Sequence, residues 1–184
     1  MTAPDTDATS NAVTQADTAP RFLTTPQGRR IAYRRTEGAG PGIVFLSGFK
    51  SDMKGTKAVA LEDWARRHGR AYLRFDYSGH GESEGEFTAG CIGDWAEDAR
   101  AAITQLTEGP QILVGSSMGG WISLLMTKAI PDHVAGLVTI AAAPISPKTA
   151  CGPGSTRRSA PRSTWWSRSP SRPITGSPTS SPSG

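Results

Sequence analysis

The chain has 184 residues, which is enough to bury one hydrophobic core, so we expect a single domain. Its formal net charge of +4 is unevenly distributed. All 16 acidic residues precede position 145, where they accompany 14 Lys and Arg, whereas residues 145–184 hold six basic residues and no acid. The body of the chain is therefore mildly acidic, which argues against a nucleic-acid-binding surface.

Cysteine content and the N-terminal residues bear on location. Cys91 and Cys151 are too few for a disulfide scaffold and stand in no zinc-binding pattern, so a reducing compartment is expected. Residues 1–20 are polar and without periodicity, which predicts a disordered leader rather than a signal peptide. No stretch approaches about 18 apolar residues, the length of a membrane-spanning helix. Together these features predict a cytoplasmic protein with no membrane span.

Two kinds of strand open the body of the chain. Residues 21–36 contain two short strand-like runs around Pro26-Gln27-Gly28, a combination that favours a tight turn, so a hairpin is predicted. Residues 42–49, GIVFLSGF, are almost unbroken in apolar character. Such a run is typical of a strand that is covered on both faces in a parallel sheet.

Helices and strands then alternate. The helix predicted over residues 55–69 has an apolar face and ends at Gly69; that face consists of Ala58, Leu61, Trp64 and Ala65. A strand over residues 71–75 leads into a glycine-rich stretch. A second helix is predicted from Asp94, with Glu97 three residues later as in a capping box. Its apolar side consists of Trp95, Ala99, Ala102, Ile103 and Leu106.

The remaining elements continue the alternation. A strand is predicted over residues 111–115, a helix over residues 118–130 and a last buried strand over residues 134–143. This order predicts the α/β class, an open and mostly parallel sheet with helices on both faces. The loops after three of its strands would meet at the carboxyl edge, where such sheets bind their ligands.

One of these loops has a reactive residue type in a distinctive pattern. In residues 115–119, GSSMG, only Ser117 has glycine two positions away on both sides, which gives G-x-S-x-G. After an apolar strand and before an amphipathic helix, this pattern is typical of a crowded turn that presents the serine hydroxyl beside free helix N–H groups. The alternatives are a turn without function and a phosphate-binding loop, but neither G-x-G-x-x-G nor G-K-[ST] occurs.

Several motifs, in this order, resemble those of the α/β-hydrolase family. FLSGF resembles the family's oxyanion loop, DYSGHGES its D-x-x-G-x-G-x-S loop and GSSMGG its nucleophile elbow. GTKA, RFDYSG and GPQILVGSSMGGW are similar, more narrowly, to the branch of mitochondrial palmitoyl-protein thioesterases and acyl-glucuronide esterases. The resemblance covers residues 22–144 and implies that residues 21–144 are a partial α/β-hydrolase domain that lacks its C-terminal strands.

The resemblance also implies the roles of three residues. Ser117 would be the nucleophile of an ester or thioester hydrolase that works through an acyl-serine intermediate, with no metal and no organic cofactor. The backbone N–H groups of Phe49 and Met118 would form the oxyanion hole. Many relatives have His-Gly where this chain has Ser47-Gly48, so the role of Phe49 depends on backbone geometry. The substrate would be a small or lipidated acyl compound, and the apolar Phe49, Met118 and Trp121 either contact its acyl group or belong to the core.

The general base is the missing part of this assignment. In this family an Asp or Glu and then a His follow the serine. His133 follows it, but the intervening helix carries the chain roughly 20 Å away, to the opposite edge of the sheet. His68 precedes a strand at that same edge, and His80 occupies a position that is usually structural. We therefore expect neither the triad acid nor the triad base in this chain, and little or no activity from it.

Residues 145–184 differ in composition from the rest. They are rich in Ser and Pro and poor in apolar residues, which predicts a disordered low-complexity tail. A flexible linker, a basic tail and an altered reading frame after Pro144 are all open interpretations. Two other functions use the same residues: a non-catalytic acyl-binding module and an acyltransferase.

Overall fold

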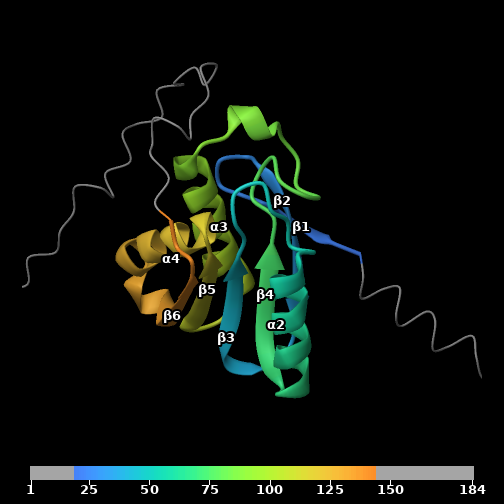
Figure 1. Cartoon of the computed structure of the whole chain (residues 1–184), viewed down its shortest axis with the longest axis vertical. Coiled ribbons are helices and arrows are strands. Elements are labelled where there is room, and N and C mark those ends of the chain that lie inside the picture. Colours follow the sequence, from blue (N-terminus) through green and yellow to red (C-terminus); the bar gives the residue numbers. More distant parts are fainter. Residues whose placement is uncertain (1–18, 144–184) are drawn as a thin grey trace, which may run out of the picture.

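The computed structural model of the chain describes residues 19–143. Its centre is a six-stranded sheet in the order β1-β2-β4-β3-β5-β6 (Figure 1). The strands are β1 (Arg21–Thr24), β2 (Arg30–Thr36), β3 (Ala39–Leu46), β4 (Arg70–Phe75), β5 (Gln111–Ser116) and β6 (Val134–Ile140). The disordered leader and the low-complexity tail expected from the sequence lie outside the described residues, apart from the leader's last two positions.

The direction of the strands confirms the predicted class. β4, β3, β5 and β6 are mutually parallel, whereas β1 and β2 form an antiparallel extension at one side. The β1–β2 hairpin turns at Gly28, whose φ of +80° is a conformation that glycine adopts without strain. The α/β fold and this hairpin were therefore both predictable from local sequence signals.

Helices cover the two faces of the sheet unequally (Figure 1). α3 (Ile92–Leu106) and α4 (Met118–Ala129) pack on one face, over a large core that includes Trp95, Ile103 and Ile122. α2 (Thr56–Arg67) packs on the other face, over a smaller cluster around Phe45 and Tyr72. Two single-turn 3-10 helices, η1 (Phe87–Ala89) and η2 (Pro131–His133), lie in the connections.

The prediction for the apolar face of α2 was right for Ala58 and Ala65 but wrong for Trp64. Trp64 was expected on the apolar face but is 40% exposed, where its ring stacks on His68. Glu62 is buried instead, because its carboxylate pairs with the buried guanidinium of Arg74 at 2.5 Å and accepts a hydrogen bond from Thr36. A charged side chain can occupy an interior position when its partner satisfies it there.

The start of α3 also differs from the prediction. The helix begins at Ile92, two residues before the expected start, and Cys91 is its N-cap. The side chain of Asp94, expected to be the cap itself, accepts a hydrogen bond from the Cys91 backbone N–H at 3.0 Å and so closes the capping box. Cysteine is not among the usual capping residues, so the sequence pattern pointed to the wrong pair.

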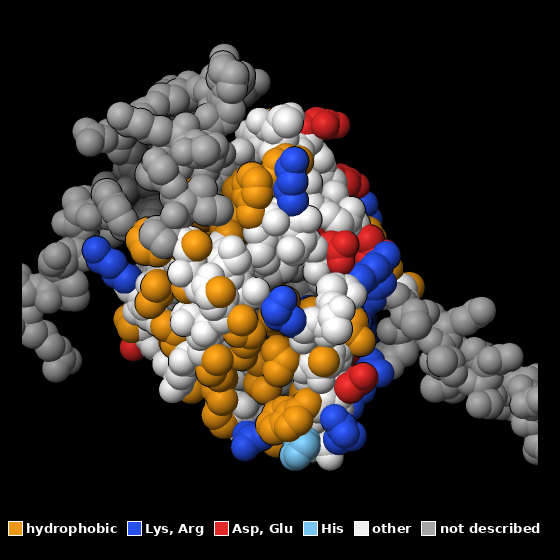
Figure 2. All heavy atoms as spheres, viewed as in Figure 1, with side chains coloured by type: hydrophobic (Ala, Val, Ile, Leu, Met, Phe, Trp, Pro, Cys, Tyr) orange, Lys and Arg blue, Asp and Glu red, His pale blue; other side chains and the backbone are white. Residues whose placement is uncertain are grey.

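Two strands differ from their expected form. β3 spans Ala39–Leu46, so it begins three residues before the apolar run 42–49, and the loop expected after Leu46 follows it. β6 was expected to be buried, but Val138 is 50% exposed. Among the described residues, α2 is the only helix on this face of the sheet, and hydrophobic side chains gather beside it on the surface (Figure 2). β6 is also the outermost strand, with no described strand beyond it.

No helix within residues 19–143 has both the length and the apolar character needed to cross a lipid bilayer.

Candidate active site

Ser117 lies at an abrupt turn between a strand and a helix. β5 ends at Ser116, α4 begins at Met118, and the single residue between them has φ 52° and ψ −116°. This backbone conformation is rare for a residue with a side chain and is found where the surrounding structure enforces it. Here the Ser117 N–H donates to the Ile140 carbonyl at 2.9 Å, and the Ser117 carbonyl accepts from the Gly120 N–H at 3.0 Å.

Two glycines allow the turn to be this tight. A Cβ atom added to Gly115 would overlap the backbone of Gly119, and one added to Gly119 would overlap the carbonyl groups of Leu46 and Ser47. The first turn of α4 therefore packs directly against the end of β5 and against the end of β3. The crowding inferred from the sequence at positions 115 and 119 is present in the structure.

The loop after β3 lies beside Ser117. A Cβ atom built on Gly48 would be 3.5 Å from the Ser117 Cβ and 3.5 Å from the Ser116 carbonyl oxygen, which places the Gly48 backbone next to the serine. Phe49 follows, with 42% of its surface exposed. The structure thus brings together two of the sequence-predicted positions, Phe49 and Ser117, at the carboxyl edge of the sheet.

The third predicted position, Met118, begins the helix. Its side chain is fully buried, and its backbone N–H belongs to the first turn of α4, where N–H groups have no partner within the helix. The helix dipole adds partial positive charge at this end. The region next to Ser117 therefore favours a negatively charged oxygen.

A buried carboxylate joins this edge to the loop after β4. Asp76 accepts hydrogen bonds from the backbone N–H groups of Met53 at 2.6 Å and Glu82 at 2.9 Å, and its side chain is completely buried. Burial raises the pKa of Asp76 to about 6, although the two backbone hydrogen bonds act in the opposite direction. Asp76 therefore holds the segment after β3 and the loop after β4 in a fixed relation.

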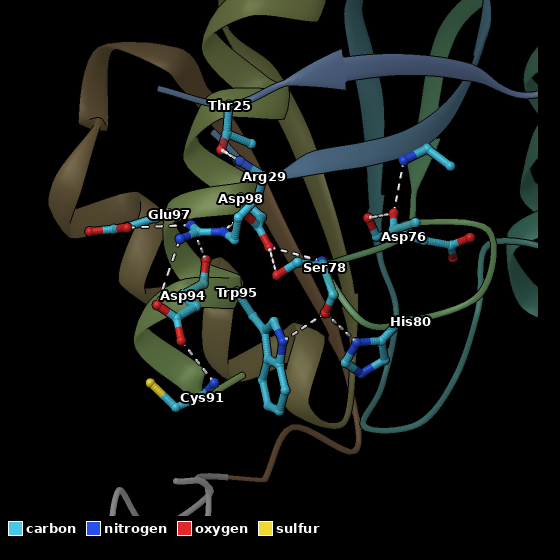
Figure 3. A network of polar contacts seen from close by, with 12 residues as sticks. Thr25, Arg29, Asp76, Ser78, His80, Cys91, Asp94, Trp95, Glu97 and Asp98 are labelled. Atoms are coloured by element: carbon cyan, nitrogen blue, oxygen red, sulfur yellow. Dashed lines mark hydrogen bonds and ion pairs between the residues drawn. The ribbon is translucent and has the colours of Figure 1, made fainter. Parts of the chain in front are cut away.

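A second buried carboxylate anchors the same loop to α3 (Figure 3). Asp98 is fully buried and accepts hydrogen bonds from the Ser78 N–H at 2.9 Å, the Ser78 hydroxyl at 2.7 Å and the Arg29 Nε at 2.7 Å. The Ser78 carbonyl in turn accepts from Trp95 Nε1 at 3.1 Å. The hydrogen bonds to the Asp98 carboxylate are charge-assisted, and such bonds are about twice as strong as neutral ones.

The three histidines of the chain lie away from Ser117 or are engaged elsewhere. His133 precedes Val134, which pairs with Gln111 at the start of β5, whereas Ile140 pairs with Ser116 at its end, so His133 lies at the opposite edge of the sheet. His68 follows α2 just before β4, also at that opposite edge, with Nδ1 2.7 Å from the Trp64 carbonyl oxygen.

His80 is the one histidine in a loop at the carboxyl edge. Its side chain is 4% exposed, and burial lowers its pKa. Nδ1 lies 3.2 Å from the Ser78 carbonyl oxygen, which can only accept, so Nδ1 carries the proton. The ring packs edge-to-face on Phe87 and Trp95, with both centroid distances 5.0 Å, which fits a structural position.

Sequence reasoning did not find the roles of Asp76, Asp98 and Arg29. Asp98 offered one signal, since it lies between Trp95 and Ala99 on the apolar side of α3, where a charged residue needs a partner. Its partner Arg29 is 69 residues away in the sequence, and local patterns do not reveal such a pair. Within residues 19–143, no three His, Cys, Asp or Glu side chains are grouped so as to hold a metal ion.

Comparison with known proteins gives consistent matches. Residues 41–169 match the family model described as serine aminopeptidase, S33. The bovine protein named palmitoyl-protein thioesterase ABHD10, mitochondrial, is 47% identical over 122 residues, which are 66% of this chain and 40% of the bovine protein. The human protein of that name is 44% identical over 122 residues, with the same coverage of both chains. This chain thus spans about 40% of the length of these curated relatives.

Solved structures match to a similar extent. Alpha/beta hydrolase domain-containing protein 10 from mouse superimposes with a TM-score of 0.66 at 43% identity, over 68% of this chain and 50% of the mouse chain. A hydrolase from Agrobacterium vitis S4 gives a TM-score of 0.64 at 39% identity, over 68% of this chain and 53% of that one. Both therefore share the sheet and the helices described above.

The comparisons also correct the prediction of location. A cytoplasmic protein was expected, but the bovine, rat and human relatives are mitochondrial proteins, so that prediction is contradicted. Cysteine content indicates the redox state of a compartment rather than its identity, which is why it gave the wrong answer.

The family match extends over more than two thirds of the sequence, and the sheet and helices agree with it. The chain belongs to the α/β-hydrolase family.

Proposed function

We propose that this chain carries the nucleophile and the oxyanion-binding groups of a hydrolase that cleaves carboxylic esters or thioesters through an acyl-serine intermediate. The observation that carries the proposal is the turn at Ser117, with φ 52° and ψ −116° between β5 and α4 and with Gly48 packed against it. The named function of the mitochondrial relatives, palmitoyl-protein thioesterase, supports an acyl substrate, which would be small or attached to a protein.

In the proposed reaction, Ser117 Oγ bonds to the substrate's carbonyl carbon while its proton passes to a general base. The carbonyl oxygen becomes an oxyanion, and the backbone N–H groups of Phe49 and Met118 donate to it. The oxyanion then collapses, the alcohol or thiol leaves with a proton, and water cleaves the acyl-serine. Preorganised donors of this kind each contribute about 10²–10³-fold to the rate.

The general base is the limiting part of the proposal for this chain. His68 and His133 lie at the opposite edge of the sheet, and the unprotonated Nε2 of His80 is buried and accepts no hydrogen bond from any described residue, Ser117 included. A serine hydroxyl without a base is a poor nucleophile. This chain by itself should therefore react several powers of ten more slowly than an enzyme with a complete triad.

Covalent labelling in the presence of imidazole tests the proposal, because imidazole can supply the absent base from solution. The chain is incubated with an alkyl fluorophosphonate, with and without imidazole, and the adduct is located by peptide mass spectrometry. We expect a slow adduct on Ser117 that forms at least tenfold faster with imidazole, because general-base assistance contributes about 10²–10⁴-fold when the base is well positioned.

Two variants make this test specific. Ser117→Ala should abolish the adduct. Ser116→Ala, one residue earlier at the end of β5 and half-buried like Ser117, should label at the wild-type rate. Equal labelling of many hydroxyl residues, or a Ser117 adduct rate that does not respond to imidazole, would contradict the proposal.

A further inference from the structure

A pair of aromatic side chains lies at the carboxyl edge next to Ser117. Phe49 is 42% exposed, although a phenylalanine normally favours the interior. It directly follows Gly48, where an added Cβ atom would lie 3.5 Å from the Ser117 Cβ. The Phe49 ring meets the half-buried ring of Phe87 edge-to-face, with centroids 5.0 Å apart. The exposed apolar surface thus begins beside the proposed nucleophile.

The pair is held on a rigid support. Trp95 is buried and contacts both rings, with centroids 5.8 Å from Phe49 and 5.7 Å from Phe87. Its indole N–H donates to the Ser78 carbonyl, and Ser78 is fixed by the buried carboxylate of Asp98 (Figure 3). The exposed rings therefore keep their positions without a ligand, which lowers the entropy lost on binding.

The chemistry of the surroundings favours a hydrocarbon chain. The Lys50 ammonium lies 5.2 Å from the Phe87 ring centroid, and Trp95 stacks on that ring, so part of the Phe87 ring is already in contact and Phe49 is the more exposed of the two. Near the top of Figure 2, hydrophobic side chains lie beside a cationic one on the visible surface. Neither phenylalanine ring carries a hydrogen-bonding group, so the surface of this pair suits an alkyl chain better than a polar group.

We infer that Phe49 and Phe87 form the surface along which the alkyl chain of the acyl group lies, leading away from Ser117. This inference rests on the proposed function and adds to it the residues that recognise the acyl chain. Burying each methylene group strengthens binding by up to about fourfold. A chain of ten carbons should therefore bind this surface far better than a chain of four.

Reversible binding of neutral alcohols tests the inference without any need for catalysis. The ¹⁵N-labelled chain is titrated with 1-decanol and with 1-butanol, and amide chemical shifts are followed by NMR. We expect 1-decanol to shift the amide signals of Phe49, Lys50 and Phe87 in a saturable way, and 1-butanol at the same concentrations to leave them unchanged. Neutral probes exclude simple attraction to the Lys50 charge.

Matched variants locate the binding surface. Phe49→Ala and Phe87→Ala should each raise the Kd for 1-decanol about tenfold, near the lower limit for losing a hydrophobic contact. Phe49→Leu, which keeps an apolar side chain, should have a smaller effect. Phe22→Ala is the control, since Phe22 is similarly exposed at 39% but lies on β1. The amide spectrum of each variant reports whether it is folded.

The outcomes separate this inference from the proposed function. Unchanged decanol affinity in both Phe49→Ala and Phe87→Ala, or shifts centred on the exposed Val138 instead, would overturn the inference. Ser117→Ala should still bind 1-decanol while forming no covalent adduct. If decanol binding depends on Phe49 but Ser117 never labels, the proposed hydrolysis fails and the alkyl-binding surface stands.

Discussion

Two segments at the same edge of the sheet are fixed by different means. The loop after β4 is held by buried carboxylates: Asp76 binds two backbone N–H groups, and Asp98 binds Ser78 and Arg29. The turn at Ser117 is held by backbone crowding around Gly115 and Gly119 and by backbone hydrogen bonds. The loop after β4 is held by side-chain hydrogen bonds, which occupy its polar groups. The turn at Ser117 is held by its backbone, which leaves the serine hydroxyl available for chemistry.

The largest effect is expected from the carboxylate-anchored loop. Asp98→Ala should lower the free energy of unfolding by about 3–5 kcal/mol, because it leaves the Ser78 N–H and hydroxyl without their buried acceptor and leaves the Arg29 guanidinium only its partly exposed acidic partners. Urea denaturation measures the change. Glu84→Gln is the control, since Glu84 pairs with the neighbouring Arg30 on the surface and should change stability by less than about 0.5 kcal/mol. Equal losses of stability in the two variants would show that the buried carboxylate does not anchor this loop more strongly than a surface ion pair does.

A smaller loss is expected at the sterically anchored turn. Gly119→Ala should lower the free energy of unfolding by about 3 kcal/mol, because the new methyl group would overlap the carbonyl groups of Leu46 and Ser47. Gly93→Ala is the matched control. Its methyl group would lie 3.8 Å from its nearest neighbour, Cys91 Sγ, in the first turn of α3, and it should stabilise by about 0.5–1 kcal/mol. Denaturation curves in which Gly119→Ala matches wild type would show that the turn is not crowded.

The third effect is a pH dependence of stability, which we expect from Asp76 in the loop after β4. The pKa of Asp76 is about 6 in the folded protein and about 3.9 in an unfolded chain. Between pH 4 and pH 6 the unfolded state therefore releases its proton first, and the contribution of this carboxyl group to the free energy of unfolding falls as pH rises, by about 2–3 kcal/mol. Above pH 6 this contribution is constant.

Denaturation midpoints measured from pH 4 to pH 7 check this dependence. Asp76→Asn should flatten the slope between pH 4 and pH 6, whereas Asp63→Asn, at an exposed position on α2, should leave it intact. Equal slopes in the wild type and Asp76→Asn between pH 4 and pH 6 would contradict the raised pKa.

The difference between the two segments also explains what could be predicted from the sequence. The sequence signal for the turn at Ser117 lies in residues that are neighbours in the chain, so G-x-S-x-G between a strand and a helix predicted it, although the turn also packs against Leu46 and Ser47. The pairs Asp98–Arg29 and Glu62–Arg74 join residues that are distant in sequence, and no local pattern indicated them. The wrong prediction that Trp64 is buried has the same origin. Glu62 lies on the interior side of α2 because it pairs with Arg74, and Trp64 lies on the exposed side.

The exposure of β6 has a different cause. Its residues, VAGLVTI, read as a buried strand because they are almost all apolar. Burial, however, depends on what packs on each face, and α2 is the only described helix on the face where Val138 is exposed. An apolar pattern therefore predicted the strand but not its surroundings.

The most direct test of the central claim is the position of the oxyanion in a covalent complex. A crystal structure of the chain with a phosphonate bound to Ser117, formed in imidazole, would measure the distances from the phosphonyl oxygen to the backbone nitrogens of Phe49 and Met118. We expect both distances to be about 2.7–3.1 Å. A phosphonyl oxygen directed to solvent, or bonded to neither nitrogen, would contradict the account.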